Sequence, residues 1–188
     1  MKHSMTLLGL LILPAAAFAD GFDYTYVEAG IVNTEIDIGP FNVDGDGFGV
    51  NGSLALTDNL HFIGGYSDQD YDFGVDGSVL NVGAGFNTAL NSDLDFVAHL
   101  SYYDVEASSA FASADDNGLG IGAGIRGRLS PKVELDAGLT YLDLDDSDTV
   151  LNARVRYYFS DSFAIAGGLS DDDSGLSWSI GVRAEFGR

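Results

Sequence analysis

The segment GLGIGAGIRGRL, from Gly118 to Leu129, decides the fold because its residues alternate between two kinds of side chain. Apart from Gly127, its odd-numbered positions carry leucine, isoleucine or alanine, and its even-numbered positions carry glycine or arginine. Successive side chains of a β-strand point to opposite faces of the sheet. The segment is therefore predicted to be a strand with one apolar face and one face of small and charged residues.

The same segment also matches the G-x-G-x-x-G fingerprint of dinucleotide-binding proteins, at Gly122 to Gly127. That fingerprint binds phosphate only as a tight turn between a strand and a helix. Neither side of the segment shows the 3.6-residue periodicity of a helix. The match is therefore interpreted as the small-residue face of a strand, and no nucleotide site is expected.

Two-residue alternation continues from Gly21 to the end of the chain, interrupted by clusters of Gly, Asn, Asp and Ser. Ten strands are predicted, over residues 22–33, 47–56, 60–72, 78–90, 94–106, 118–129, 133–143, 149–159, 163–170 and 175–187. Most of these lengths fit the ~9–11 residues of a tilted membrane-spanning strand.

Two kinds of connection alternate between the predicted strands. Three-residue turns are expected at 57–59, 91–93, 130–132 and 160–162, and longer or more acidic links at 34–46, 73–77, 107–117, 144–148 and 171–174. Short turns at one end and longer loops at the other are typical of an outer-membrane barrel.

Alternation alone does not say which face points inward, because a lipocalin-like soluble barrel would bury the apolar face. Two features favour a membrane barrel. The polar face is rich in glycine and serine, which suit a crowded lumen, and aromatic residues stand near both ends of the apolar face. The expected aromatic girdles are Phe48, Tyr66, Tyr102, Tyr141 and Trp178 on the loop side, and Phe62, Phe86, Phe96, Phe159, Phe163 and Phe186 on the turn side.

From YTYVEAGIV (24–32) to SWSIGVRAEF (177–186), the chain resembles the small outer-membrane β-barrel proteins of Gram-negative bacteria, the OmpA/OmpX-like and opacity-type superfamily. The resemblance implies an all-β, antiparallel, up-and-down transmembrane barrel in the outer membrane. Ten strands are predicted for it, and the eight strands of the commonest members are the alternative.

Residues 1–19 are predicted to be a cleaved signal peptide, and residues 20–188 the barrel. Lys2 supplies a basic start, Leu7–Leu13 an apolar stretch, and Ala17–Ala19 an A-x-A cleavage site. The apolar stretch is shorter than the ~20 residues of a membrane-anchoring helix. The chain has no cysteine, so it uses no disulfide.

The charge balance restricts the partners. Eight Lys and Arg oppose 29 Asp and Glu, for a formal net charge of −21, which argues against nucleic acid as a partner. Outer-membrane lipid, lipopolysaccharide and divalent cations are the expected partners. Only His61 and His99 follow the signal peptide, and neither is expected at the outer rim, so no cofactor, transition-metal site or catalytic group is predicted.

A cluster of charged residues is expected on the inner face, in the middle and turn-side half of the barrel. Its members are Glu28, Arg126, Arg128, Glu134, Asp136, Arg154, Arg156, Arg183 and Glu185. Enclosed charges are tolerable when they are paired, so the cluster is either a structural plug of ion pairs or a selectivity filter. Above it, smaller residues predict an outward-opening vestibule, at Gly65, Ser67, Asn81, Gly83, Gly120, Gly122, Thr140, Gly168, Ser170, Ser177 and Ser179.

The acidic links are the second candidate site, because clustered carboxylates suit hard cations. The residues concerned are Asp44, Asp46, Asp68, Asp70, Asp72, Asp145, Asp146, Asp148, Asp171, Asp172 and Asp173. NVDGDG (42–47) matches the first half of a calcium loop, but Ser53 stands at the twelfth position, so it is not an EF-hand. Solvated loop charge is the alternative interpretation.

These observations predict a small, non-catalytic barrel, monomeric, with a structural or narrow-pore, porin-like role in the cell envelope. The alternative is a surface-recognition or adhesion protein, or one that binds cations and lipopolysaccharide through acidic extracellular loops.

Overall fold

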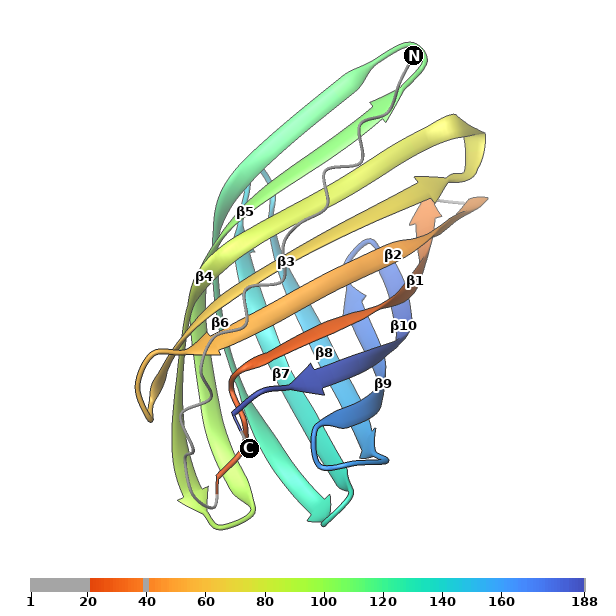
Figure 1. Cartoon of the computed structure of the whole chain (residues 1–188). Helices are drawn as coiled ribbons and strands as arrows, with labels where there is room; N and C mark the ends of the chain where they lie inside the picture. The colour runs from red at the N-terminus through yellow and green to blue at the C-terminus, as the bar shows by residue number, and fades with distance from the viewer. Residues whose placement is uncertain (1–20, 39–40, 188) are drawn as a thin grey trace, which may run out of the picture.

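The computed structural model describes residues 21–38 and 41–187, which form one closed antiparallel barrel (Figure 1). Its ten strands are β1 (Tyr26–Ile38), β2 (Phe41–Ala55), β3 (Leu60–Tyr71), β4 (Val75–Asn91), β5 (Leu94–Ser109), β6 (Ser113–Ser130), β7 (Val133–Asp143), β8 (Ser147–Tyr158), β9 (Phe163–Asp172) and β10 (Gly175–Glu185). Each strand pairs with its neighbour in sequence, and β10 returns to pair with β1.

The ten-stranded up-and-down barrel is thus confirmed, and the eight-stranded alternative is wrong. One short 3₁₀ helix, η1 (Asp72–Gly74), connects β3 to β4. In the part of the chain that the structure describes, no helix is long and apolar enough to cross a membrane. The predicted signal peptide lies outside the described residues.

The apolar face of every strand points outward. On β10, Trp178, Ile180 and Val182 are 40%, 53% and 51% exposed, whereas Arg183, which follows Val182 and faces the other way, is 1% exposed. Both predicted aromatic girdles lie on this outer surface, from Phe96 at 36% exposed to Phe159 at 53%. An outer wall of this composition requires hydrocarbon around it. The membrane orientation predicted from the small-residue face and the aromatic girdles is therefore confirmed, and the lipocalin-like alternative is wrong.

The glycines of the quoted segment give space inside the barrel to the rings of the neighbouring strand. A Cβ atom on Gly122 would collide with the imidazole of His99, and one on Gly120 would lie 2.5 Å from the ring of Tyr103. Both rings come from β5, which pairs with β6 along this segment. The even-numbered positions are therefore small because larger inward side chains of β5 occupy the space above them.

The predicted acidic links are wrong in extent, because the strands continue through them. β1 reaches Ile38 and β2 begins at Phe41, so the expected 34–46 link is a paired hairpin. Likewise, β5 continues as far as Ser109 and β6 already begins at Ser113, so most of the expected 107–117 link is also paired. The apolar alternation ends where the outer face meets water, but the backbone ladder needs no apolar face and continues past that point.

The strands therefore extend well beyond the membrane at one end of the barrel, and at the other end they are joined by short turns. β6 has 18 residues, well beyond the ~9–11 that cross the hydrocarbon layer, and its hairpin with β5 projects at the top of Figure 1. The turns at 56–59, 92–93, 131–132 and 159–162 lie at the opposite end, together with the first described residues and the C-terminus (Figure 1). We assign the extended end to the cell exterior and the trimmed end to the periplasm.

The β1–β10 seam that closes the barrel supplies a test of the fold. Gly30 pairs with Gly181 there, and a Cβ on Gly30 would collide with the Ile180 carbonyl and lie 2.6 Å from the Gly181 Cα. We expect Gly30→Val to destabilise the barrel by on the order of 3 kcal/mol, because the backbone itself must move. The measurement is urea unfolding in detergent, with heat-modifiable gel mobility as the check for a closed barrel.

Gly167→Val is the matched control, because nothing lies closer than 3.9 Å to the Cβ position of Gly167 on the neighbouring β9. Equal stability of the two variants would contradict tight packing at the seam.

Candidate functional site

A short strap closes the periplasmic mouth of the barrel. It consists of residues 22–25, which the sequence placed at the start of the first strand; β1 begins instead at Tyr26. Tyr24 is 9% exposed, its hydroxyl donates a hydrogen bond to the Asp95 carboxylate on β5 at 2.8 Å, and its ring stacks on His61 of β3 at 4.7 Å. The strap therefore bridges strands that are not neighbours of β1.

The strap is also bonded to β6 and to the C-terminal segment. The Asp23 carbonyl accepts a hydrogen bond from Nη1 of Arg126 at 2.7 Å, and the Asp23 carboxylate accepts one from the Gly187 amide at 2.6 Å. The Arg126 guanidinium lies 4.9 Å from the ring centroid of Phe22 and 5.1 Å from that of Tyr24. Charge, hydrogen bonds and ring contacts thus hold the strap across the lumen.

Behind the strap lies the first part of the charged network. Arg126 pairs with Glu134 at 2.6 Å and with Glu185 at 3.3 Å, and the Tyr158 hydroxyl lies within hydrogen-bond distance of both carboxylates. None of these four side chains belongs to a residue more than 3% exposed. They fill the periplasmic half of the lumen.

Glu28 is the centre of the second part of the network. Its carboxylate lies 2.8 Å from Arg183, 3.2 Å from Arg154 and 3.5 Å from Arg156. Arg156 also pairs with Asp136. Three guanidinium groups therefore depend on one carboxylate, which makes Glu28 the most connected acid of the network.

The structure brings together eight of the nine residues predicted for the lumen cluster. Four arginines, at 126, 154, 156 and 183, face four acids, at 28, 134, 136 and 185, so the network is neutral. The ninth, Arg128, does not join it: it lies at the periplasmic mouth, 4.0 Å from the exposed Asp93 and over the Phe22 ring. Two residues along a strand is enough to carry a side chain from the lumen to the mouth.

Cross-strand register explains why the charges meet. Arg126 is paired directly with Asp136, and Asp136 with Arg154 on its other side, while Glu28 is paired with Arg183 across the seam. Opposite charges on directly paired residues stabilise a sheet. Most inward charges therefore have an oppositely charged residue on an adjacent strand, whereas Glu185, which is paired with Tyr26, meets Arg126 only across the lumen.

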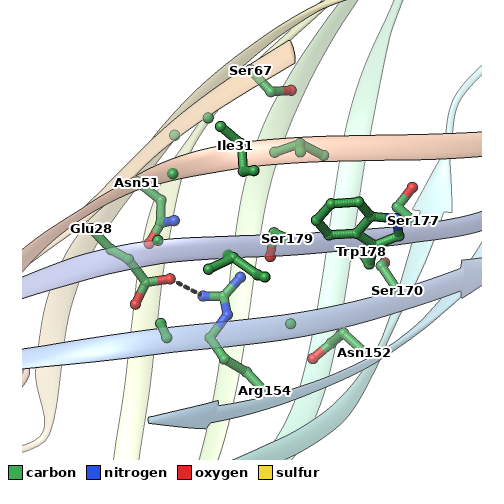
Figure 2. Close-up of a pocket in the computed structure, with 18 of the residues that line it drawn as sticks. Glu28, Ile31, Asn51, Ser67, Asn152, Arg154, Ser170, Ser177, Trp178 and Ser179 are labelled. Carbon is green, nitrogen blue, oxygen red and sulfur yellow. Dashed lines mark ion pairs between the residues drawn. The ribbon is translucent and has the colours of Figure 1, made fainter. Parts of the chain in front are cut away.

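Above the network, the predicted vestibule is present as a cavity of about 420 Å³ (Figure 2). Glu28 and Arg154 form an ion pair at its base (Figure 2). Nine neutral polar side chains contribute to its walls: Thr34, Asn51, Ser67, Gln69, Asn81, Asn152, Ser170, Ser177 and Ser179. Of the positions predicted to line it, Gly83, Gly120, Gly122 and Thr140 are not part of the wall.

A second cavity of about 260 Å³, the inner cavity, lies alongside the network. It shares Asp136, Asn152 and Arg154 with the vestibule wall, so these residues separate the two spaces. His61 and His99 line the inner cavity as well, away from the outer rim. The lumen thus contains the vestibule and, beside the network, the inner cavity, whose lining reaches the strap at Tyr24.

The acids predicted to form cation-binding loops lie on hairpins. Asp44 and Asp46 are in β2, Asp68 and Asp70 in β3, Asp72 in η1, Asp148 in β8, and Asp171 and Asp172 in β9; only Asp145, Asp146 and Asp173 lie in turns between strands. Among residues 21–38 and 41–187, no three His, Cys, Asp or Glu side chains are grouped so as to hold a metal ion.

Several residues of the closed half escaped the sequence analysis. Tyr158 alternates in phase with Arg154 and Arg156, and that inward phase could have placed it with them. Asp95 is likewise in phase with His99 on β5, and Tyr24 with Glu28. The departure of Tyr24 from the wall gave no signal, because a strap shows the same alternation as a strand.

Removing the shared carboxylate tests the network. We expect Glu28→Gln to lower the free energy of unfolding by about 3–5 kcal/mol, because three guanidinium groups lose their common partner in an enclosed space. Urea unfolding in detergent measures this. Asp93→Asn, which removes the exposed partner of Arg128, should cost less than about 1 kcal/mol. A Glu28→Gln barrel as stable as the control would show that the network does not hold the fold.

The sequence and the structure were compared with those of known proteins. The family model described as outer membrane protein beta-barrel domain matches residues 5–187. Among solved structures, the β domain of the Bordetella autotransporter BrkA has a TM-score of 0.52 at 13% identity, covering 87% of this chain and 100% of that one. Ail, the attachment invasion locus protein of Yersinia pestis, has a TM-score of 0.45 at 17% identity, covering 86% and 97%.

The KdgM porin in complex with disordered oligogalacturonate has a TM-score of 0.48 at 10% identity, covering 86% of this chain and 99% of that one. No curated protein matches the sequence. The family match spans nearly the whole chain and agrees with the closed barrel and its apolar outer wall. The chain therefore belongs to the outer membrane protein beta-barrel domain family, and it resides in the outer membrane of a Gram-negative bacterium.

Proposed function

We propose that this protein is a non-catalytic structural barrel of the outer membrane, whose lumen is a blind vestibule open to the exterior and not a pore. The observation that carries the proposal is the closed periplasmic half. Arg183 and Glu134 are each 1% exposed there, and the strap is bonded to Arg126, the partner of Glu134. Water and solutes entering the vestibule meet ion pairs and not a channel.

The narrow-pore alternative requires this half to open. Arg126 would have to leave two carboxylates and the Asp23 carbonyl at once, and the other members of the network have several partners each. Separating enclosed, hydrogen-bonded charges costs several kcal/mol per unpaired ion. A stable closed state with no spontaneous conductance is therefore the expected condition of the molecule.

The outer surface supports an individual barrel surrounded by lipid. Every strand carries large apolar side chains that are exposed on the outer face, as Ile31 on β1, Leu100 on β5 and Leu151 on β8 illustrate. No sector of the wall is polar enough to need a protein partner. We therefore propose that the barrel acts as a monomer in contact with acyl chains over its whole circumference.

Single-channel recording tests the blind vestibule. We expect the unaltered protein in planar bilayers to show no steady open state, and Tyr24→Ala combined with Tyr158→Ala to show a small ohmic conductance. The two substitutions remove buried rings from the closed half while leaving every charge in place.

Tyr157→Ala is the matched control for that recording, because Tyr157 precedes Tyr158 on β8 but is 51% exposed on the outer face. It should remain silent. A steady unitary conductance from the unaltered protein would defeat the closed-lumen proposal in favour of the pore.

A second candidate function is recognition at the acidic exterior, in which divalent cations bridge the hairpins to lipopolysaccharide. The observation in its favour is that acids of different hairpins lie close together. The Asp145 amide donates to the Asp116 carboxylate at 3.1 Å, and the Asp44 amide to the Asp72 carboxylate at 3.4 Å. Because the described carboxylates do not converge, the proposed attraction is a diffuse one that salt screens.

Calorimetry with calcium tests this diffuse attraction. We expect measurable heat at low ionic strength that disappears at physiological ionic strength, since exposed charges are screened over about 8 Å there. Asp93→Asn, which removes one acid at the opposite end of the barrel, serves as the control and should leave the heat nearly unchanged. A saturable calcium isotherm that persists at physiological salt would contradict the diffuse attraction and indicate a discrete site.

A further inference from the structure

We propose that the vestibule is a binding site for a neutral sugar that enters from the exterior. The proposal goes beyond the structural role proposed above and rests on it only for the opening of the vestibule to the exterior. The space has a volume of about 420 Å³, which corresponds to roughly fourteen water molecules at about 30 Å³ each. A single sugar ring with part of its hydration water fits such a space.

Three side-chain amides in the vestibule wall are available to a ligand. They belong to Asn51, Asn81 and Asn152 on β2, β4 and β8, so they approach the space from different parts of the barrel. Within residues 21–38 and 41–187, none of these amides bonds to another protein group. Asn51 and Asn81 are half-buried and Asn152 is exposed, so the amides are open to the cavity and not enclosed in the wall. Each amide offers both N–H donors and an acceptor oxygen.

Serine hydroxyls add further donors and acceptors to the same wall. Those of Ser67, Ser170 and Ser179 likewise bond to no other group in the described part of the chain. Figure 2 shows these serines together with Asn51 and Asn152 around the space. A sugar hydroxyl both donates and accepts hydrogen bonds, as these side chains do. A wall that mixes donors and acceptors is therefore complementary to a sugar, whereas a wall of donors alone would favour an anion.

Tyr71 places an aromatic ring above this wall, on the way in from the exterior. It shares the inward face of β3 with Gln69 of the vestibule wall and lies two residues nearer the outer end of the strand. A Cβ atom on Gly45 of β2 or on Gly77 of β4 would collide with the Tyr71 ring. Because the ring approaches both neighbouring strands, it lies flat across the wall and directs one face at the lumen. The apolar C–H face of a sugar ring can stack on such an aromatic surface.

The charges of the vestibule favour a neutral sugar over an acidic one. Its described lining holds two carboxylates, those of Glu28 and Asp136, and one guanidinium, that of Arg154. Arg154 lies 3.2 Å from the Glu28 carboxylate, so its charge is already paired. The hairpins above carry further acids, such as Asp70 and Asp76, which are directly opposite each other on β3 and β4. A carboxylated sugar would therefore meet a negative potential both on entry and at the base.

Side-chain amide ¹H–¹⁵N spectra of the refolded protein test the proposal, in a phosphocholine detergent that carries no sugar. The probes are methyl glucoside, methyl galactoside and N-acetylglucosamine, with glucuronate as the acidic arm at constant ionic strength. We expect saturable shifts of the Asn51 and Asn152 signals with at least one neutral sugar, and at least tenfold weaker binding of glucuronate. The Asn117 signal should not move, because Asn117 shares the outer face of β6 with Leu119.

Asn152→Leu removes an amide from the wall and keeps a side chain of similar size, so the affinity for the neutral sugar should fall at least tenfold. Asn117→Leu is the matched control and should bind within twofold of the unaltered protein. If Asn152→Leu does not give the heat-modifiable folded form, Asn51→Leu replaces it, with the same expected loss.

The absence of a saturable shift with all three neutral sugars, or equally tight binding of glucuronate, would overturn the proposal. This result is distinct from a failure of the closed lumen. A steady conductance together with saturable sugar shifts would defeat the closure alone and support the sugar site.

Discussion

The constraint on which this molecule depends is that hydrocarbon offers no hydrogen bonds to a peptide group. A sheet that crosses the membrane must therefore pair its last strand with its first, and β10 returns to β1 along eleven residue pairs, from Tyr26 with Glu185 to Ile36 with Gly175. Closure then divides every strand into residues that face acyl chains and residues that are enclosed. The sequence alternates for this reason, because successive residues of a strand face the lipid and the lumen in turn.

Closure also gives the barrel a polar interior, whereas the interior of a soluble protein is mostly apolar. Among the described residues, the buried apolar side chains are only Tyr24, Tyr158, Ala164 and Ala166, while thirteen polar or charged residues are buried. An interior of this kind cannot be held by hydrophobic burial, so it is held by partners. Glycine positions admit the rings of His99 and Tyr103, cross-strand register sets Arg126 beside Asp136, and contacts across the lumen complete the network. The polar interior is specific because each enclosed charge requires a partner at a defined place.

The sequence was sufficient to predict what the pattern repeats in every strand, and insufficient where the outcome depends on the third dimension. The orientation of the faces follows from the small residues of the polar face and the aromatic residues at both ends of the apolar face. The number of strands follows from the alternation, so ten strands were predictable. The strand ends were not, because Glu35 and Asp44 pair in the ladder beyond the membrane although neither residue is typical of a strand. Arg126 and Arg128 share a face and a residue type, yet strand tilt leaves one deep in the lumen and the other at the mouth. The strap could not be distinguished from a strand, because its residues leave the barrel wall without any change in the alternation of the sequence.

The position of the carboxylates, and not their number, determines what the lumen can do. Four acids balance four arginines, but the neutral sum alone does not explain the closure. Glu134 and Glu185 meet Arg126, which is also bonded to the strap, and Glu28 meets Arg154, Arg156 and Arg183. Removing one of these acids would leave an enclosed guanidinium without a partner, whereas removing an exposed acid such as Asp93 would not. The closed half is therefore held by where the carboxylates lie in the fold.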